Sequence, residues 1–308
     1  MEGKALIERG RDNISYAFFP LFPVLLRLVG GEVGGREWGG VVLNNLVFLV
    51  ALEVLFRTIK KTEGSGVAIR SMMLMAAYPW GIFFRAGYTE SLYLLLMAAW
   101  VKWMGEERWV WASLAAGLMG VTRGVGMLLV GWYGWKLVKQ VRQKKLEWSR
   151  ALVALMVCVA PVLVWWGFNY RQTGDAWYFA KVQDEWNGKN PLLNNLKILL
   201  VSGDLIREGH WVVGVNLIAM LFSIWVLVRG WRKLPRDWWW ILAVLAVVPM
   251  VTTVSIAKSY ARFISVAFPL FVYMGGKLKT KEVVMVSGVG CAVMVAVGLC
   301  FTNWVWVG

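Results

Sequence analysis

The sequence predicts an all-α membrane protein, a polytopic helix bundle that crosses the bilayer about ten times. Hydrophobic side chains make up 59% of its 308 residues and the mean hydropathy is +0.58, whereas soluble domains contain about 45–50% apolar residues even with glycine counted. Only 17% of the residues are charged, and they gather in short segments between long apolar stretches. These observations exclude an ordinary soluble domain, and the 21 Trp, 14 Phe and 9 Tyr residues exclude a disordered chain.

A transmembrane helix needs about 20 apolar residues, and somewhat fewer where it is buried among other helices. On that basis five longer and five shorter stretches are read as spans. The predicted spans are 38–57, 71–85, 90–104, 109–122, 124–138, 150–168, 211–228, 238–256, 262–276 and 282–302. No solenoid-type repeat is visible, so residues 1–308 are read as a single multi-pass domain.

The distribution of basic residues supports this count. Cytoplasmic loops of membrane proteins carry an excess of Lys and Arg. Five loops of this kind, assigned to the cytoplasmic side, hold 19 of the 33 basic residues against six acidic ones: 57–70, 102–108, 136–150, 229–237 and 277–282. The +15 net charge therefore indicates membrane topology rather than a nucleic-acid partner.

The start of the chain is unusual for such a topology. Ten crossings with an external C-terminus place residues 1–37 outside as well. Their first segment, MEGKALIERGRDN, is charged and has no apolar core of a signal peptide. We therefore expect a further helix to precede residue 1, which makes this sequence N-terminally truncated.

The external side is predicted to carry helices that lie on the membrane. The long external loop 169–210 contains PLLNNLKILLVSGDLI at 191–206, whose apolar residues have helical spacing. FFPLFPVLLRLVG at 18–30 is a second such element, because Arg27 is unfavourable inside a span. Interfacial helices above a helical bundle indicate a cavity that faces outward.

Ionisable residues at membrane depth are costly and usually face a cavity. Arg123 lies between two apolar stretches in GLMGVTRGVGMLL, and its guanidinium suits binding of phosphate oxygens in a dry site. Alternatively, it snorkels from a tight turn whose glycines serve helix packing. Glu90 is a candidate base, sugar ligand or partner for Arg85 or Arg123. The alternative for Glu90 is a helix-start charge favoured by the macrodipole, with Thr89 as the cap.

Asp175 follows a long span and would face the outer cavity, where Trp177, Tyr178 and Trp186 offer apolar faces for a sugar ring. The alternative is an interfacial aromatic belt with an incidental turn acid.

Three further features bear on possible ligands: a pair of basic residues, the histidine and cysteine content, and a glycine-rich segment. Arg262 and Lys258, at an external helix end, are candidates for an anionic headgroup. His210 is the single histidine, and Cys158, Cys291 and Cys300 all lie in apolar stretches, so neither a metal site nor a disulfide framework is expected. The segment GGEVGGREWGG precedes no Walker-type lysine, so nucleotide binding is not expected either.

Five motifs together resemble the PIG-V-type mannosyltransferases, a family of multi-pass glycosyltransferases of the GT-C class. They occur in the family's order and spacing between residues 5 and 275: AFFPLFPVLLRL (17–28), YTESLYLLL (88–96), GLMGVTRGVGMLL (117–129), GDAWYFAKVQDEW (174–186) and ARFISVAFPLF (261–271). The resemblance implies transfer of a hexose, typically mannose, from a polyprenyl-phosphate-linked sugar to a lipid-linked or glycan acceptor. Relatives in GPI-anchor synthesis perform this transfer on the luminal face.

The resemblance also implies the surroundings of the reaction. The partners would be the lipid-linked donor, the acceptor and membrane lipids, with no nucleic acid, cofactor or metal. The site would face outward from a bacterial plasma membrane, or the lumen of the endoplasmic reticulum in a eukaryote.

Residue roles follow from the matched motif positions. The resemblance implies donor-phosphate binding by Arg123 and Arg262, catalytic roles for Glu90 and Asp175, substrate contacts through Tyr88, Gln183 and Trp186, and further motif positions at Phe19, Pro20, Pro23 and Thr89. Because a lipid phosphate is a good leaving group, it needs cationic stabilisation more than a general acid. The acceptor hydroxyl needs one carboxylate base within hydrogen-bond reach.

Two departures from the family pattern stand out. Gly124 occupies a position where family members often have a polar residue. The family also carries a Trp-Asp pair in its first external loop, whose aspartate is the expected base, and this chain begins just after that place. Asp12, Glu90 and Asp175 are the nearest substitutes. The predicted topology and the resemblance to the family therefore both lead to the expectation of an N-terminal truncation.

Two other functional classes stay open at the level of sequence. A transporter or lipid flippase often shows inverted repeats and helices broken near the midplane in both halves, whereas the charged positions here gather at external helix ends. A non-catalytic fragment or assembly subunit is the other alternative, raised by the missing N-terminal motif.

Overall fold

The computed structural model describes residues 18–29, 36–187, 190–208 and 210–303, and it contains helices and no strand within them. The helices in chain order are α2 (Leu21–Val29), α3 (Arg36–Glu63), α4 (Ser65–Ala76), the 3-10 helix η2 (Gly81–Phe84), α5 (Glu90–Gly105), α6 (Trp109–Gly120), α7 (Gly124–Arg142), α8 (Trp148–Thr173), α9 (Tyr178–Asn187), α10 (Pro191–Arg207), α11 (Trp211–Gly230), α12 (Arg236–Thr252), α13 (Ser255–Lys258), α14 (Tyr260–Ile264), α15 (Phe268–Lys277) and α16 (Thr280–Thr302). The predicted all-α class is confirmed.

Four helices in the described part of the chain are long and apolar enough to cross a membrane. They are α3 from Trp38, α8, α11 and α16, and they match the predicted spans 38–57, 150–168, 211–228 and 282–302. A multi-pass membrane protein follows from these helices by length and composition. The remaining predicted spans are shorter or interrupted helices, and the count of ten crossings stays a prediction.

Prolines explain two of the interruptions. The predicted span 71–85 divides, because α4 ends at Ala76 and η2 begins at Gly81. Pro79 lies in that gap, and a proline disfavours helical geometry at the residue before it. The predicted span 262–276 divides into α14 and α15, where Pro269 occupies the first turn of α15. Finally, the predicted loop 57–70 is mostly helical, because α3 and α4 are separated by Gly64 alone.

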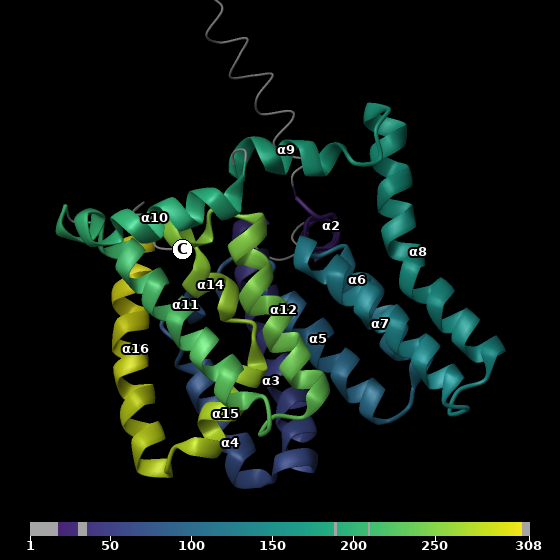
Figure 1. Cartoon of the computed structure of the whole chain (residues 1–308), viewed down its shortest axis with the longest axis horizontal. Helices are drawn as coiled ribbons and strands as arrows, with labels where there is room; N and C mark the ends of the chain where they lie inside the picture. The colour runs from purple at the N-terminus through teal and green to yellow at the C-terminus, as the bar shows by residue number, and fades with distance from the viewer. Residues whose placement is uncertain (1–17, 30–35, 188–189, 209, 304–308) are drawn as a thin grey trace, which may run out of the picture.

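The basic turns lie at one end of the bundle. Figure 1 shows the α3–α4, α11–α12 and α15–α16 connections together at its lower end, whereas α9 and α10 lie across the opposite end. The helix predicted at 191–206 is α10, and the one predicted at 18–30 is α2. The assignment of these two ends to the cytoplasmic and external sides of a membrane stays a prediction.

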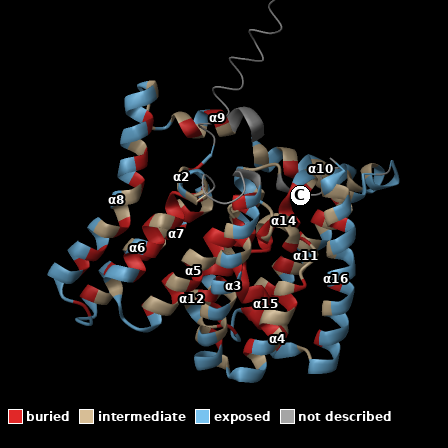
Figure 2. Ribbon diagram, turned by 180° about the vertical axis from the view of Figure 1, so that it is seen from behind, coloured by how far each residue is buried: buried red, intermediate tan, exposed pale blue. Residues whose placement is uncertain are grey.

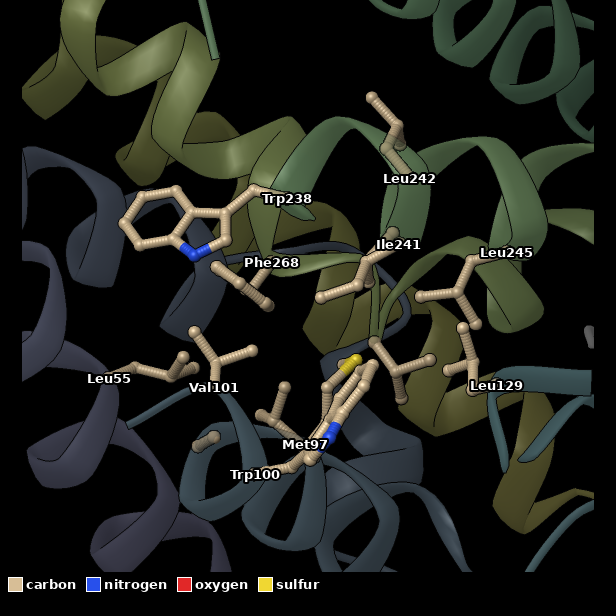
Figure 3. Packing of buried hydrophobic residues seen from close by; sticks show 14 of the residues in the cluster. Leu55, Met97, Trp100, Val101, Leu129, Trp238, Ile241, Leu242, Leu245 and Phe268 are labelled. Atoms are coloured by element: carbon tan, nitrogen blue, oxygen red, sulfur yellow. The ribbon is translucent and has the colours of Figure 1, made fainter. Parts of the chain in front are cut away.

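One large apolar core joins the central helices (Figure 2). Leu55 of α3 and Trp100 of α5 belong to it, as do Leu129 of α7, Ile241 of α12 and Phe268 of α15 (Figure 3). A partly exposed ion pair between Lys136 of α7 and Asp237 of α12 joins two of these helices near the basic end. The core therefore fixes the helices whose opposite ends carry the candidate site.

Candidate anion-binding site

Two arginines from distant segments share one buried carboxylate. Glu90, the first residue of α5, is fully buried. Arg262 of α14 donates from Nε to Glu90 Oε1 over 2.6 Å, and Nη1 of Arg123 lies 3.2 Å from the same oxygen. The two arginine side chains are only 13% and 14% exposed. Of the roles left open for Glu90, the structure supports that of partner to Arg123 and adds Arg262.

Aromatic rings hold both guanidinium groups in place. Arg262 lies over Tyr88, 4.3 Å from the ring centroid, and over Phe83 at 4.6 Å. The guanidinium group of Arg123 lies farther from its neighbouring rings, 5.5 Å from the ring centroid of Phe263 and 5.8 Å from that of Tyr93. Cation–π contacts at these distances favour a fixed, partly desolvated guanidinium. The charges are therefore positioned before any ligand arrives.

A turn between α6 and α7 presents Arg123. Its backbone is extended at the N-cap position of α7, and two glycines allow the close packing around it. A Cβ on Gly126 would lie 2.1 Å from the carbonyl oxygen of Met119, and one on Gly117 would lie 2.4 Å from that of Cys158 in α8. The packing role expected for the glycines is therefore present. The expectation that Arg123 snorkels to the surface is wrong, because its side chain is only 14% exposed, and phosphate binding by Arg123 stays a prediction.

The arginines line a large, mainly apolar cavity of about 1720 Å³, whereas pockets for small ligands measure about 300–1,000 Å³. Its walls come from α2, α7, α8, α9 and α12, and the cations among its described lining residues are Arg27, Arg123 and Arg262. Predicted substrate contacts Tyr88 and Gln183 line it as well. Glu90 does not line it, so that carboxylate acts on the cavity through the arginines.

The motif position Phe19 packs on the turn that carries Arg123. The Phe19 ring lies edge-on to Phe179 of α9 at 5.7 Å between centroids, and Phe19 approaches Gly124 closely. The backbone N–H of Leu21 donates to the carbonyl of Val121 over 3.2 Å. The start of α2 and the α9 helix therefore cover the α6–α7 turn together.

Buried polar residues that the sequence analysis did not select fix the two halves of the site. Asn216 of α11 accepts the N–H of Ala261 at 2.8 Å, and the Tyr78 hydroxyl donates to the Ala261 carbonyl, also at 2.8 Å. Asn44 of α3 donates to the carbonyls of Ala86 and Tyr88. Both asparagines are fully buried. The sequence feature that could have identified these two asparagines is a polar side chain inside an apolar span.

The described neighbours leave part of the cluster without hydrogen bonds. Glu90 Oε2 and Arg123 Nη1 are buried and make no hydrogen bond there, although Nη1 keeps its 3.2 Å ion pair with Glu90 Oε1. The Nη1 and Nη2 atoms of Arg262 make no hydrogen bond to a described residue either. Arg donors recognise carboxylates and phosphates, and both arginines line the cavity. The unpaired Nη atoms of Arg262 can therefore take up an anion from the cavity.

Asp175 has a local role in the structure. Its Oδ1 accepts the N–H of Trp177 at 2.8 Å, and its Oδ2 pairs with Lys181 of α9 at 2.5 Å. The hydrogen bond from Lys181, followed by that from Trp177, holds the pKa of the Asp175 carboxyl below its usual range. Asp175 does not line the cavity, although Trp177 does. The alternative considered for Asp175, an acidic residue that stabilises a turn, is thus present in the structure.

The other predicted residues lie apart from the cluster or outside the described side chains. His210 is exposed at the N-cap position of α11, and Lys258 is exposed at the end of α13. Thr89 is the N-cap residue of α5, but its side chain makes no capping hydrogen bond, which corrects that expectation. The side chain of Trp186 lies outside the described part of the chain, and so does Asp12.

Comparison with family models, curated proteins and solved structures finds no match for this chain.

Proposed function

We propose that the protein is a membrane glycosyltransferase that moves a hexose from a polyprenyl-phosphate-linked sugar to a lipid-linked or glycan acceptor. The observation that carries the proposal is the pair Arg123 and Arg262, fixed by buried Glu90 at the wall of a large apolar cavity. An anionic group joined to a long apolar chain satisfies both features of this site. Mannose as the sugar rests on the resemblance to the PIG-V-type family.

The proposed topology places this site on the external or luminal face. In it the chain crosses the membrane ten times, with α2 and α10 lying at the interface. Exposed Leu192, Leu196 and Leu200 give α10 an apolar surface for that position. The proposed location is a bacterial plasma membrane, or the membrane of the endoplasmic reticulum in a eukaryote.

The proposed reaction is displacement at the anomeric carbon of the sugar. The acceptor oxygen forms a bond to that carbon, and the bond from the carbon to the phosphate oxygen breaks, leaving its electron pair on the phosphate. Arg123 and Arg262 stabilise the added negative charge. The hydroxyl proton passes to a carboxylate base.

Three carboxylates were candidates for that base, and Asp12 lies outside the described residues, which leaves Glu90 and Asp175 to compare. Glu90 is enclosed by the arginines and has no contact with the cavity. Asp175 does not line the cavity either, but it lies two residues before the lining residue Trp177 and its side chain is 28% exposed, whereas that of Glu90 is fully buried. Asp175 must release Lys181 before it accepts a proton. Within the proposal, Asp175 is therefore the base candidate and Glu90 a positioning residue.

Purified protein in lipid nanodiscs tests the proposal. With a radiolabelled polyprenyl-phosphate mannose and a membrane lipid extract as acceptor, we expect labelled product and one free polyprenyl phosphate per sugar transferred. Arg123→Gln and Arg262→Gln should each lower the rate about 10²–10³-fold. Arg85→Gln is the matched control, because Arg85 is partly buried but does not line the cavity.

Two results would count against the proposal. Transfer at the wild-type rate by both arginine variants would remove the site assignment. Movement of intact labelled donor across the bilayer of a liposome, without transfer, would favour the flippase instead.

A further inference from the structure

The carboxylate of Glu90 halves the charge that the cavity receives from its arginine pair. Both guanidinium groups contact the same oxygen, Oε1, and Glu90 itself is fully buried away from the cavity. A ligand in the cavity therefore meets Arg123 and Arg262 but feels all three charges. Two positive charges and one negative charge leave the cluster at +1.

Lipid phosphates differ in charge in a way that this cluster can distinguish. A phosphodiester, such as a sugar–phosphate–lipid, carries one negative charge. A phosphate monoester carries about −1.5 to −2 at neutral pH, because its second pKa is about 6. Moving an anion from water into a buried apolar site costs a desolvation free energy that grows with the square of its charge, whereas its attraction to the cluster grows only in proportion to its charge. A cluster of +1 can therefore compensate the desolvation of a −1 ligand better than that of a −2 ligand.

We propose that Glu90 is a specificity-determining residue that sets the anion site to +1 and thereby makes it select lipid phosphodiesters over lipid phosphate monoesters. This inference rests on the proposed function for the lipid-phosphate ligand. It gives Glu90 a role that needs no contact with substrate. The burial of Glu90 and its two ion pairs carry the inference.

The selection has a consequence for turnover. Transfer of the sugar converts the phosphodiester donor into a phosphate monoester product, which carries more negative charge. A site of +2 would hold that product more tightly than the donor. With Glu90 in place the site favours the donor and releases the product.

The other charged side chains that the structure describes near the cavity do not alter this count. Arg27 lines the cavity from α2 but is exposed to solvent, where its charge is screened. Lys181 is paired with Asp175 on the external side, so together they are neutral. The buried cluster therefore determines the preference.

A charge series in the intact protein tests this inference. The variants change the net charge of the cluster from +1 in the wild type. Glu90→Gln makes it +2, Arg123→Gln makes it 0, and the double variant Glu90→Gln/Arg123→Gln returns it to +1. Gln keeps the size of Glu90 and an oxygen that accepts from Arg262 Nε. Glu53→Gln is the control, because Glu53 is an exposed glutamate of α3.

The probes are a tritiated polyprenyl phosphate and its methyl phosphodiester, which share one chain and differ by one methyl group. Their equilibrium binding is measured in nanodiscs at pH 8 and pH 5. Wild type, the control and the double variant should prefer the diester at pH 8. Glu90→Gln should shift that preference about tenfold toward the monoester, and the shift should shrink at pH 5, where the monoester loses its second charge. Arg123→Gln should weaken both ligands.

An unchanged preference in Glu90→Gln, or a monoester preference in the double variant, would overturn the inference. Thermal unfolding of each variant identifies loss of fold. If Glu90→Gln alone does not fold, the double variant should still bind both ligands more tightly than Arg123→Gln, and equal binding would refute the charge account. Binding is independent of transfer: selective binding without sugar transfer would refute only the glycosyltransferase, whereas wild type binding neither probe would refute both proposals.

Discussion

Replacing Asn216 by Leu tests how the position of Arg262 is maintained. The side-chain oxygen of Asn216 accepts the buried N–H of Ala261 over 2.8 Å, one residue before Arg262. Leucine has a similar volume but leaves this N–H without a partner. An unpaired buried amide costs about 1–3 kcal/mol. The Tyr78 hydroxyl still holds the carbonyl of Ala261 at 2.8 Å, so we expect displacement of Arg262 rather than unfolding.

The assay combines stability with donor binding. Asn216→Leu should lower the unfolding free energy in detergent by the stated amount and weaken binding of the polyprenyl phosphodiester about tenfold. Adding Tyr78→Phe removes the second hydrogen bond to Ala261. The effects of the two substitutions on the unfolding free energy should then deviate from additivity by about 0.5–3 kcal/mol, as is usual for residues that share a partner. The control is Asn45→Leu, since among the described residues the Asn45 amide donates to the carbonyl of Val41 in its own helix and to no other group.

The comparison between the two asparagines decides the outcome. If Asn216→Leu destabilises the protein but binds donor as Asn45→Leu does, Asn216 is structural only. Equal behaviour of the two variants in both measurements would refute the reasoning altogether.

Two further predictions concern the external turn and the helix packing. Lys181→Ala should raise the pKa of Asp175, because the hydrogen bond from Lys181 is the largest cause that lowers it. The carboxylate then protonates at a higher pH, so the acid limb of the profile of transfer rate against pH should move to higher pH. An unmoved acid limb would exclude Asp175 as the base. Gly117→Val should destabilise the fold by about 1–3 kcal/mol through overpacking, because its Cβ would meet the Cys158 carbonyl at 2.4 Å. Gly167→Ala, with nothing within 4 Å of the added Cβ, is the matched control in thermal unfolding, and equal melting temperatures would contradict the packing argument.

The helices were largely predictable because membrane-length apolar stretches leave few alternatives. The predicted segment 191–206 corresponds to α10 at Pro191–Arg207, where Pro191 occupies the first turn. The predicted span 71–85 was wrong in its continuity, although Pro79 within it was the warning. The helix α9 was missed, since its residues lack a sustained apolar stretch.

The candidate site was predictable only in its components. Arg123, Glu90 and Arg262 stood out as charges beside apolar stretches, and sequence reasoning named Arg123 as a partner for Glu90. The stronger contact joins Glu90 to Arg262, 172 positions away, and tertiary packing alone brings these residues together. Asn216 shows the same limit, because its acceptor role depends on the backbone of α14 lying beside α11.

Donor binding by Arg262→Gln tests the central claim most directly, namely that the buried arginine pair binds a lipid phosphate. Tritiated polyprenyl phosphodiester is titrated into nanodiscs that contain wild type, Arg262→Gln or the control Arg85→Gln. Loss of one charge-assisted contact of about 1.5–3 kcal/mol should weaken binding by roughly 10- to 100-fold in Arg262→Gln, while Arg85→Gln binds as wild type does. Equal affinities for all three proteins would contradict the account.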